Sequence, residues 1–467
     1  MSARKIGFLI LLLLFGAVVE TTWRVREDGF MLGPEGCRVL GGRFYGPSFT
    51  FEDSQSRVLP GGEVLRVEVR NEFGDVRVEA GDGEEVQVRL RKVVYLPTEE
   101  KARAFAERIE LRLETEGGRL RVGTNRGELE TGRDVGFETH LELHVPPASV
   151  VEVGTDHGEA VVEGVAQAIV RTSFGDVQVK DVLGPVSIEA RHGEVRAGSV
   201  GADLTIDARH GDVELERVGG HSELKVEHGA IRARNTAGLE ARVSFGELSV
   251  EGVQGDLLVV SSHGAVAATG VRGSVDAETS FAEIRLTGVG GDARARTQHG
   301  GIVATDISGG LVAETSHAGV ELDRVAGPVE VSVQHGGLEA RALGRGARVR
   351  ASEDEVSVDG FAGPVDVVVE RGGVRLTTTA PVVWPITASA TDVRLVVPPG
   401  SRFDLDAESR RGELRLDLPG LGALSPDEEG RSRATATVGG GGEPVKLRAE
   451  GDVVVETGPA ATTPEAP

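Results

Sequence analysis

Apolar and polar residues alternate along most of this chain in a pattern that repeats every 17 or 18 residues. Each repeat centres on a two-residue turn, most often His-Gly, and apolar or small residues recur at positions −6, −4, −2, +3, +5 and +8 from the first turn residue. Around His210 these positions hold Leu204, Ile206, Ala208, Val213, Leu215 and Val218. A period of two on both sides of a turn predicts two β-strands per repeat, each with one face turned inward.

The turns themselves mark the repeat. Their first positions are His157, Phe174, His192, His210, His228, Phe245, His263, Phe281, His299, His317, His335, Glu353 and Arg371. Self-similarity at this period is typical of a solenoid, in which each repeat stacks on the next. An 18-residue rung also suits a left-handed β-helix, but that fold needs an apolar period of six. The period of two favours an all-β, single-stranded parallel β-helix or solenoid with 18-residue two-strand rungs.

A second turn, rich in glycine, falls seven to nine residues before the first. Its glycines are Gly184, Gly220, Gly255, Gly273, Gly291, Gly327 and Gly363. We expect them to supply the positive φ angles that tight turns need.

The pattern divides the chain into segments. We expect a signal peptide or membrane anchor at 1–23, a linker at 24–60, a small β-rich unit at 61–147, the solenoid at 148–378, a β cap at 379–457 and a disordered tail at 458–467. Within the β-rich unit, Pro97-Thr98-Glu99-Glu100 predicts a short helix with Thr98 as its N-cap.

The N-terminus resembles an export signal. Arg4 and Lys5 precede an apolar run over 6–19, which is shorter than the ~20 residues of a comfortable membrane span. Because no good cleavage site follows, a cleaved signal and an inner-membrane tether through residues 6–19 both remain open. In either case the positive-inside rule predicts a body outside the cytoplasm, in the periplasm or on the cell surface.

Composition narrows the range of partners. The 467 residues carry a formal charge of −23 and only 4% aromatic residues, which argues against a nucleic-acid partner because such binding needs a basic surface. The low aromatic content suits a thin solenoid filled with Val, Ala and Leu. The single cysteine, Cys37, excludes an intramolecular disulfide.

Eight of the 11 histidines occupy the first position of the turn, and this column invites a metal-binding hypothesis. Phenylalanine takes the same position in Phe174, Phe245 and Phe281, however, and a phenyl ring cannot ligate a metal. The position shares parity with −2, −4 and −6, so we interpret the column as partly buried, inward-facing rings that stack between rungs. We also expect Glu353 and Arg371 to pair across one rung, and we assign no metal ligand.

Catalytic motifs are absent from the sequence: it contains no nucleophile elbow, P-loop, HExxH or dinucleotide fingerprint. We therefore expect no enzyme activity and assign no catalytic or cofactor-binding residue and no cofactor.

Four features together resemble the bacterial putative-adhesin family of β-strand-repeat proteins, also called toastrack domains. They are Phe73-Gly74-Asp75-Val76, the helix after Pro97, Val145-Pro146-Pro147 and the repeated [His/Phe]-Gly-[Asp/Glu]-Val turns. The resemblance covers about 60–460 and implies an exported, β-helical, non-enzymatic domain of unknown function. Some relatives resemble accessory parts of envelope-stress signalling systems.

Three hypotheses for function follow. The first is an exported scaffold or adhesin-like interaction surface of the cell envelope, whose partner is an envelope protein or a polysaccharide. The second is an accessory sensory domain of an envelope-stress system. The third is a β-helix that binds or cleaves polysaccharide.

Overall fold

The computed structural model describes residues 39–40, 43–44, 47–58, 65–83, 85–130, 135–381, 383–418 and 431–458. The predicted export segment, Cys37 and nearly all of the predicted tail lie outside these ranges. The chain divides into two compact units, Met1–Leu183 and Gly184–Pro467, and consists almost entirely of β-structure arranged as a parallel solenoid of about 14 turns. The predicted all-β solenoid is confirmed.

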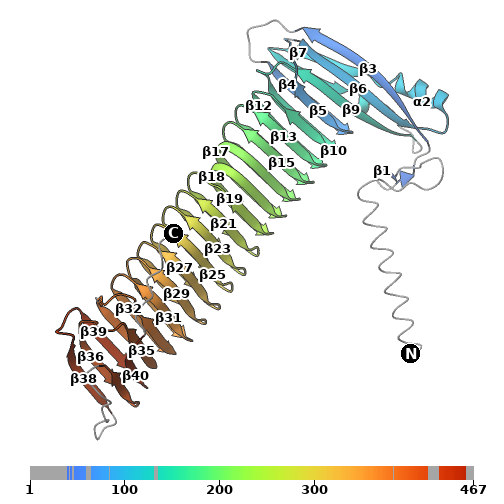
Figure 1. The fold of residues 1–467 in the computed structure, drawn as a ribbon. Helices are drawn as coiled ribbons and strands as arrows, with labels where there is room; N and C mark the ends of the chain where they lie inside the picture. The colour runs from blue at the N-terminus through green and yellow to red at the C-terminus, as the bar shows by residue number, and fades with distance from the viewer. Residues whose placement is uncertain are drawn as a thin grey trace, which may run out of the picture. The chain divides into compact units, whose positions relative to one another are not determined.

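The first unit contains two parallel sheets whose far edges continue into antiparallel strands (Figure 1). In one sheet the strand order is β7-β8-β4-β10-β12, and in the other it is β3-β6-β9-β5-β11-β13. The bounds are β1 Val39–Leu40, β2 Arg43–Phe44, β3 Ser48–Val58, β4 Arg66–Phe73, β5 Val76–Ala80, β6 Glu85–Tyr95, β7 Leu111–Glu116, β8 Arg119–Thr124, β9 Gly136–Val145, β10 Val150–His157, β11 Ala160–Glu163, β12 Gln167–Phe174 and β13 Val177–Val182.

The predicted helix is α2, Glu99–Ala106, which contacts β3 and β6. The Thr98 hydroxyl caps its N-terminus by accepting a hydrogen bond from the Lys101 amide at 3.5 Å, as predicted. Ala102, Phe105 and Ala106 are buried. Their spacing of three and four residues places them on one face of the helix, which packs against the strands. A short 3₁₀ turn, η1, follows at Arg126–Glu128.

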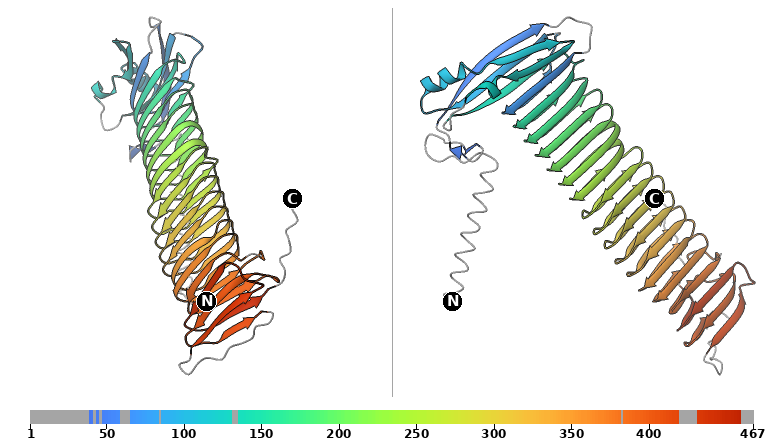
Figure 2. Two further views of the ribbon diagram at one scale, coloured as in Figure 1. Left: turned by 90° about the vertical axis from the view of Figure 1, so that its left-hand side faces the viewer. Right: turned by 180° about the vertical axis from the view of Figure 1, so that it is seen from behind.

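The second unit is the regular part of the solenoid, and Figure 2 shows its strands stacked in successive turns. The bounds are β14 Val186–His192, β15 Val195–Val200, β16 Leu204–His210, β17 Val213–His228, β18 Ile231–Phe245, β19 Leu248–Glu251, β20 Leu257–Ser261, β21 Val266–Val271, β22 Val275–Thr279, β23 Ile284–Val289, β24 Ala293–Thr297, β25 Ile302–Ile307, β26 Leu311–Thr315, β27 Val320–Val325, β28 Val329–Val333, β29 Leu338–Leu343, β30 Ala347–Glu353, β31 Val356–Phe361, β32 Val365–Arg371, β33 Gly373–Thr377, β34 Ile386–Ala390, β35 Asp392–Val397, β36 Phe403–Ser409, β37 Leu414–Asp417, β38 Ser432–Val438, β39 Pro444–Ala449 and β40 Val453–Thr457.

Parallel pairing keeps equivalent residues of successive turns side by side. Ile206 pairs with Leu224, for example, and Leu215 pairs with Ala233. The six positions predicted to face inward around His210 are all buried, none more than 2% exposed. Each turn therefore adds a thin apolar layer, which explains how the chain builds a core with few aromatic residues.

In all turns but the last, the residue seven positions after the first turn residue has a left-handed backbone. Examples are Arg217, Asn235 and Ala342, with φ of 57°, 56° and 54°, and Gly270, with φ of 69°. This kink changes the parity of the strand, so positions +5 and +8 both face inward although they are an odd number of positions, three, apart.

The second-turn glycines do not act as expected. The positive φ angles lie at other positions, such as Gly211 at 146° in the His-Gly turn. A Cβ on Gly273 or Gly327 would instead lie 2.5 Å or 2.4 Å from the backbone carbon of Gly255 or Gly309, respectively, in the preceding turn. Glycine at this corner therefore permits close stacking of backbones rather than a left-handed turn.

The C-terminal strands insert before the end of the stack. β39 pairs with β34 on one side and β36 on the other, and β40 lies likewise between β35 and β37. β38 then pairs antiparallel with β36. In the first unit, β4 and β5 occupy the same kind of inserted place, between the β8–β9 and β10–β11 strands. In both units, strands that come later or earlier in the chain are thus inserted next to the end of the parallel stack, and antiparallel strands lie beyond it.

Candidate functional site

The rings at the first turn position form stacked columns within each unit. In the second unit the rings run from His192 to His335, with centroids 4.6 to 5.3 Å apart and planes within 16° of parallel except at the last pair. In the first unit Phe73, His157 and Phe174 stack at 4.4 and 4.9 Å. The predicted stacking is confirmed.

The prediction that these rings face inward is wrong. Phe174, Phe245 and Phe281 are 48%, 47% and 54% exposed, and the histidines of the column are exposed as well. The strand ends at or just before this position. A glycine with positive φ follows Phe174 and Phe245, but Ala282 follows Phe281, which is just as exposed, so the end of the strand rather than the glycine places the ring outside the inward face. Parity along a strand therefore ceases to predict burial where the strand turns.

Charged groups terminate the columns. In the first unit the Arg126 guanidinium lies between the Phe73 ring, 4.5 Å from its centroid, and the Phe137 ring at 4.0 Å. In the second unit the Glu353 carboxylate contacts the His335 Nδ1 at 2.9 Å and the Arg371 guanidinium, which confirms the predicted Glu353–Arg371 pair. Its hydrogen bond to His335 and the charge of Arg371 lower the pKa of Glu353.

The ring column is poorly suited to binding a ligand. Because each ring covers the face of its neighbour, only the ring edges reach solvent, and a sugar cannot stack on them as it would on an open aromatic face. Within the described ranges no three His, Cys, Asp or Glu side chains are placed to hold a metal ion. The column is best understood as a ladder that joins the corners of successive turns.

A groove lies elsewhere on the second unit. Its volume is about 1240 Å³, and it follows the starts of the first strands of eight successive turns, from Asp256 to Thr387. Every turn contributes residues at positions −7 to −5, so the lining repeats with the solenoid. At about 4.8 Å per strand the groove extends for roughly 35 Å. We call this surface the strand-start groove.

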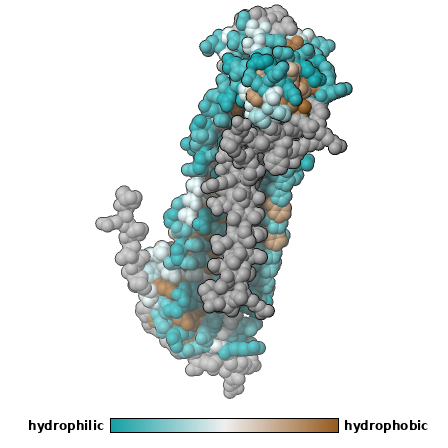
Figure 3. Space-filling view, turned by 90° about the vertical axis from the view of Figure 1, so that its right-hand side faces the viewer, coloured by the Kyte–Doolittle hydropathy of each residue, from teal (hydrophilic) through white to brown (hydrophobic). Residues whose placement is uncertain are grey.

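The lining of the strand-start groove is mixed. Leu258, which is 37% exposed, and Val312 contribute apolar surface. The intervening outward positions alternate in charge, through Asp276, Arg294, Glu330, Arg348 and Asp366. Asp256 and Asp292 stabilise its rim by accepting hydrogen bonds from the Ser274 and Gly310 amides at 2.8 and 2.7 Å. Figure 3, which shows another view of the molecule, has small apolar areas on a mostly hydrophilic surface over the lower part of this unit.

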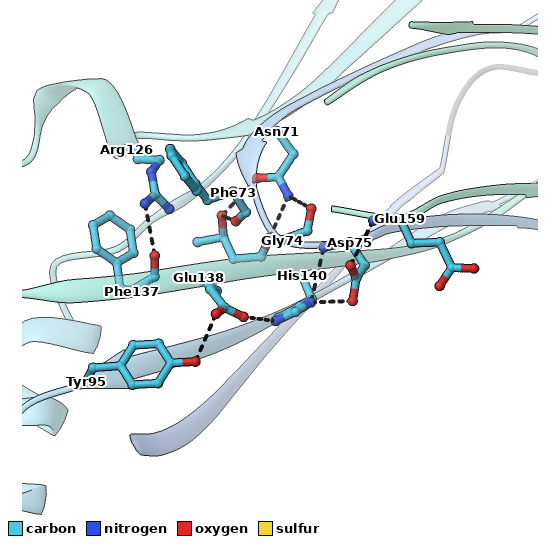
Figure 4. A network of polar contacts seen from close by, with 11 residues as sticks. Asn71, Phe73, Gly74, Asp75, Tyr95, Arg126, Phe137, Glu138, His140 and Glu159 are labelled. Atoms are coloured by element: carbon cyan, nitrogen blue, oxygen red, sulfur yellow. Dashed lines mark hydrogen bonds and ion pairs between the residues drawn. The ribbon is translucent and has the colours of Figure 1, made fainter. Parts of the chain in front are cut away.

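A buried polar network lies in the first unit (Figure 4). The Tyr95 hydroxyl donates to Glu138 Oε1 at 2.8 Å, and Glu138 Oε2 lies 3.2 Å from His140 Nε2. On its other side, His140 Nδ1 lies 3.0 Å from Asp75 Oδ2 and 3.1 Å from the Asp75 amide nitrogen. Asp75 Oδ1 in turn accepts a hydrogen bond from the Glu159 amide at 2.9 Å, so the network joins the β4–β5 turn to the β10–β11 turn.

The two carboxylates determine the charge of this network. Burial opposes the imidazolium of His140, but its hydrogen bonds to Asp75 and Glu138 outweigh that effect and raise its pKa. Burial likewise acts to raise the pKa of Asp75, yet the hydrogen bonds from His140 and the Glu159 amide lower it. A neutral ring accepts from the Asp75 amide at Nδ1, whereas a protonated ring donates from Nδ1 to the Asp75 carboxylate.

Sequence reasoning missed both the groove and the network. His140 stands outside the turn column, and that position was the one available indication of a different role. An aspartate that follows a turn can also join successive turns: Asp212 Oδ1 accepts a hydrogen bond from the Ala230 amide at 2.8 Å, as Asp75 Oδ1 does from the Glu159 amide. Among the described residues, no helix has the length and apolarity to cross a membrane.

Comparison with known proteins gives distant structural matches. No curated protein matches it significantly. A putative adhesin from Bacteroides fragilis NCTC 9343 is 12% identical over 54% of this chain and 97% of its own, with a TM-score of 0.28. A putative cell adhesion protein from Clostridium sporogenes ATCC 15579 is 5% identical over 87% and 100%, with a TM-score of 0.15. A putative adhesin from Parabacteroides distasonis ATCC 8503 is 12% identical over 69% and 98%, with a TM-score of 0.20.

The family predicted from the turn motifs is confirmed by a family model that covers most of the chain. The model for Toastrack DUF4097 matches residues 64–456, which include nearly all described strands of both units. The chain belongs to the Toastrack DUF4097 family.

Proposed function

We propose that this protein is a non-enzymatic, adhesin-like component of the cell envelope that binds an extended polysaccharide along the strand-start groove. The observation that carries the proposal is the groove itself, a continuous hollow over eight turns of the second unit. The export signal predicted from residues 1–23 supports a place outside the cytoplasm.

The repeating lining suits a linear polymer. Aliphatic side chains such as Leu258 and Val312 match the apolar faces of pyranose rings, and the polar groups of each turn face hydroxyls that recur along a glycan. The lining also carries more acids than bases: five acidic side chains against the three arginines Arg294, Arg345 and Arg348. This excess of two negative charges disfavours a polyanion and favours a neutral polymer.

A polypeptide strand fits this surface less well. Strands in this part of the sheet, such as β24 and β28, already pair on both sides. The groove therefore offers no free sheet edge to which a peptide could add as a strand.

Co-sedimentation with purified envelope polysaccharides tests the proposal. Val312→Arg places a charge in the groove and should weaken retention by about tenfold, because it fills apolar contact surface with a solvated group. Val303→Arg is the matched control: Val303 is also a half-buried valine on an outward position, but it lies on β25 and does not line the groove. Equal loss in both variants, or no retention of any polysaccharide by the unmodified chain, contradicts the proposal.

A further inference from the structure

A second hollow lies in the first unit, on the outer side of β4, β7 and β8. Its volume is about 410 Å³, within the range of small-molecule sites. Charged side chains make up most of its lining, and they are Glu68, Arg70, Arg112, Glu114, Arg119 and Arg121. Four arginines and two glutamates line the hollow. Two further acids outside the lining, Glu116 and Glu128, form ion pairs with Arg121 and Arg112, so the four guanidinium groups converge on the hollow without a large net charge.

A glycine opens the floor of this hollow. Gly123 lies in β8 opposite Arg112 of β7, and a Cβ added there would meet only the Arg70 carbonyl oxygen, at an acceptable 3.4 Å. Gly154 of β10, which pairs with Arg70, has equal freedom, because its nearest neighbour would be 3.9 Å away. Neither residue has the positive φ that requires glycine.

Two glycines inside strands therefore lie near Arg70 although neither the backbone conformation nor close packing requires glycine there. Glycine weakens a strand interior and commonly marks a place where another molecule approaches the backbone closely. Here their effect is to clear the outward space beside Arg70, where a side chain would otherwise stand between the arginines.

Glu68 holds three of the arginines together. Only 6% of this residue is exposed, and its carboxylate lies 2.8 Å from Arg70, 3.4 Å from Arg119 and 3.6 Å from Arg121. One carboxylate cannot saturate three guanidinium groups, each of which has five N–H donors. Arg112 is positioned separately by Glu128, with Nη1 2.6 Å from Oε1.

We infer that this hollow is a binding site for a small anion bearing carboxylate or phosphate groups, such as an acidic or phosphorylated sugar. Convergent guanidinium groups bind such planar or multivalent anions in bidentate fashion. Gly123 lets the anion approach the strand backbone, and Glu68 keeps the arginines oriented before the ligand arrives. The site lies in the first unit and does not depend on the function proposed for the strand-start groove.

Calorimetric titration of the full chain at low ionic strength tests this site, with inorganic phosphate and glucuronate as separate probes and glucose as the uncharged comparison. We expect one or both anions to bind and glucose not to bind, with affinity falling as salt is added. The relative affinities distinguish a phosphorylated ligand from a carboxylated one.

Two variants locate the binding. Gly123→Val fills the floor without removing a charge, and Arg121→Gln removes one charge without filling it; each should weaken anion binding by about tenfold or more. Gly198→Val is the control for the first, because Gly198 lies inside β15 with similar free space, its added Cβ being 3.9 Å from the nearest atom. Arg89→Gln is the control for the second, because Arg89 is an exposed arginine of the same unit, 3.4 Å from Glu142.

The inference is overturned if neither anion binds the unmodified chain, or if the control variants lose binding as much as the site variants do. Circular dichroism confirms that each variant is folded before it is titrated. Should Arg121→Gln fail this check, Gly123→Val still decides the outcome alone, since it leaves every arginine in place.

Discussion

Single residues in this protein act mainly by controlling how one turn meets the next. Ala342 and Arg217 accept left-handed backbones that ordinarily favour glycine, and the cost is tolerated because the kink turns two apolar positions inward. The side chains of Asp75 and Asp212 each accept a hydrogen bond from a backbone amide of the following turn. His140 differs from the other histidines in lying between two carboxylates, those of Asp75 and Glu138.

The His140 network should make the first unit less stable as the pH rises. Because the folded-state pKa of His140 is raised above its ordinary value of 6.5, its stabilising contribution is complete below about pH 6.5 and is lost as the pH passes the raised value. The lowered pKa of Asp75 acts at the other end, since its contribution is present above 3.8 and is lost in acid. The change is measured as the free energy of unfolding, from urea denaturation at pH 6 and at pH 8. Hydrogen-exchange rates of the β9 amides then report the stability of the first unit specifically.

His140→Gln should flatten this pH dependence between pH 6 and pH 8. His144→Gln is the control, because His144 is an exposed histidine on the same strand. If the two variants show the same pH profile as the unmodified chain, the network does not govern the stability of the unit.

The strands of successive turns in the second unit are nearly equivalent, and the turns that connect them set the distance between neighbouring backbones. Strands such as β22 and β24 pair in register through Val275–Ala293 and Ala277–Ala295, so any misfit at a corner would propagate along the pair. The second-turn glycines prevent that misfit. The ring ladder joins the opposite corners, where Phe281 stacks between His263 and His299 at 4.9 Å on each side.

Gly273→Ala tests the role of the corner glycines. Its added methyl group would lie 2.5 Å from the Gly255 carbon and 2.4 Å from the Asp256 carboxylate, so the backbones must separate. We expect the free energy of unfolding to fall by about 1–3 kcal/mol, as for other overpacked sites. Gly198→Ala, with its nearest atom 3.9 Å away, should change it far less. Chemical denaturation measures both, and equal effects would show that close stacking is not what glycine provides.

At the scale of the whole molecule, the main problem is to end a stack of strands without leaving open edges. In the second unit the last strands of the chain, β39 and β40, lie between earlier strands, and β38 adds an antiparallel strand to the outermost turn. Such arrangements limit edge-to-edge association, which exposed strand edges otherwise promote.

A chain that ends after Asp417 should associate with itself. It lacks β38, β39 and β40, so β34 and β35 lose their outer partners and can pair with another copy. Size-exclusion chromatography with light scattering should show concentration-dependent oligomers. A chain that ends after Gly458 keeps every described strand and serves as the control. A strictly monomeric Asp417 truncation would contradict this account of the ends.

The sequence by itself determined the two-strand turn, the buried positions such as Leu204 and Leu215, the stacking of His210 with its neighbours and the family. These features depend on local alternation and on an 18-residue period, both of which are visible in the chain. The tertiary structure decided the exposure of the rings, the close approach of successive backbones at Gly273, the insertion of β39 and β40, and the arginine-lined hollow beside Glu68. Each of those results from backbones and side chains distant in sequence meeting across turns or sheets, and residue spacing along one strand does not contain that information.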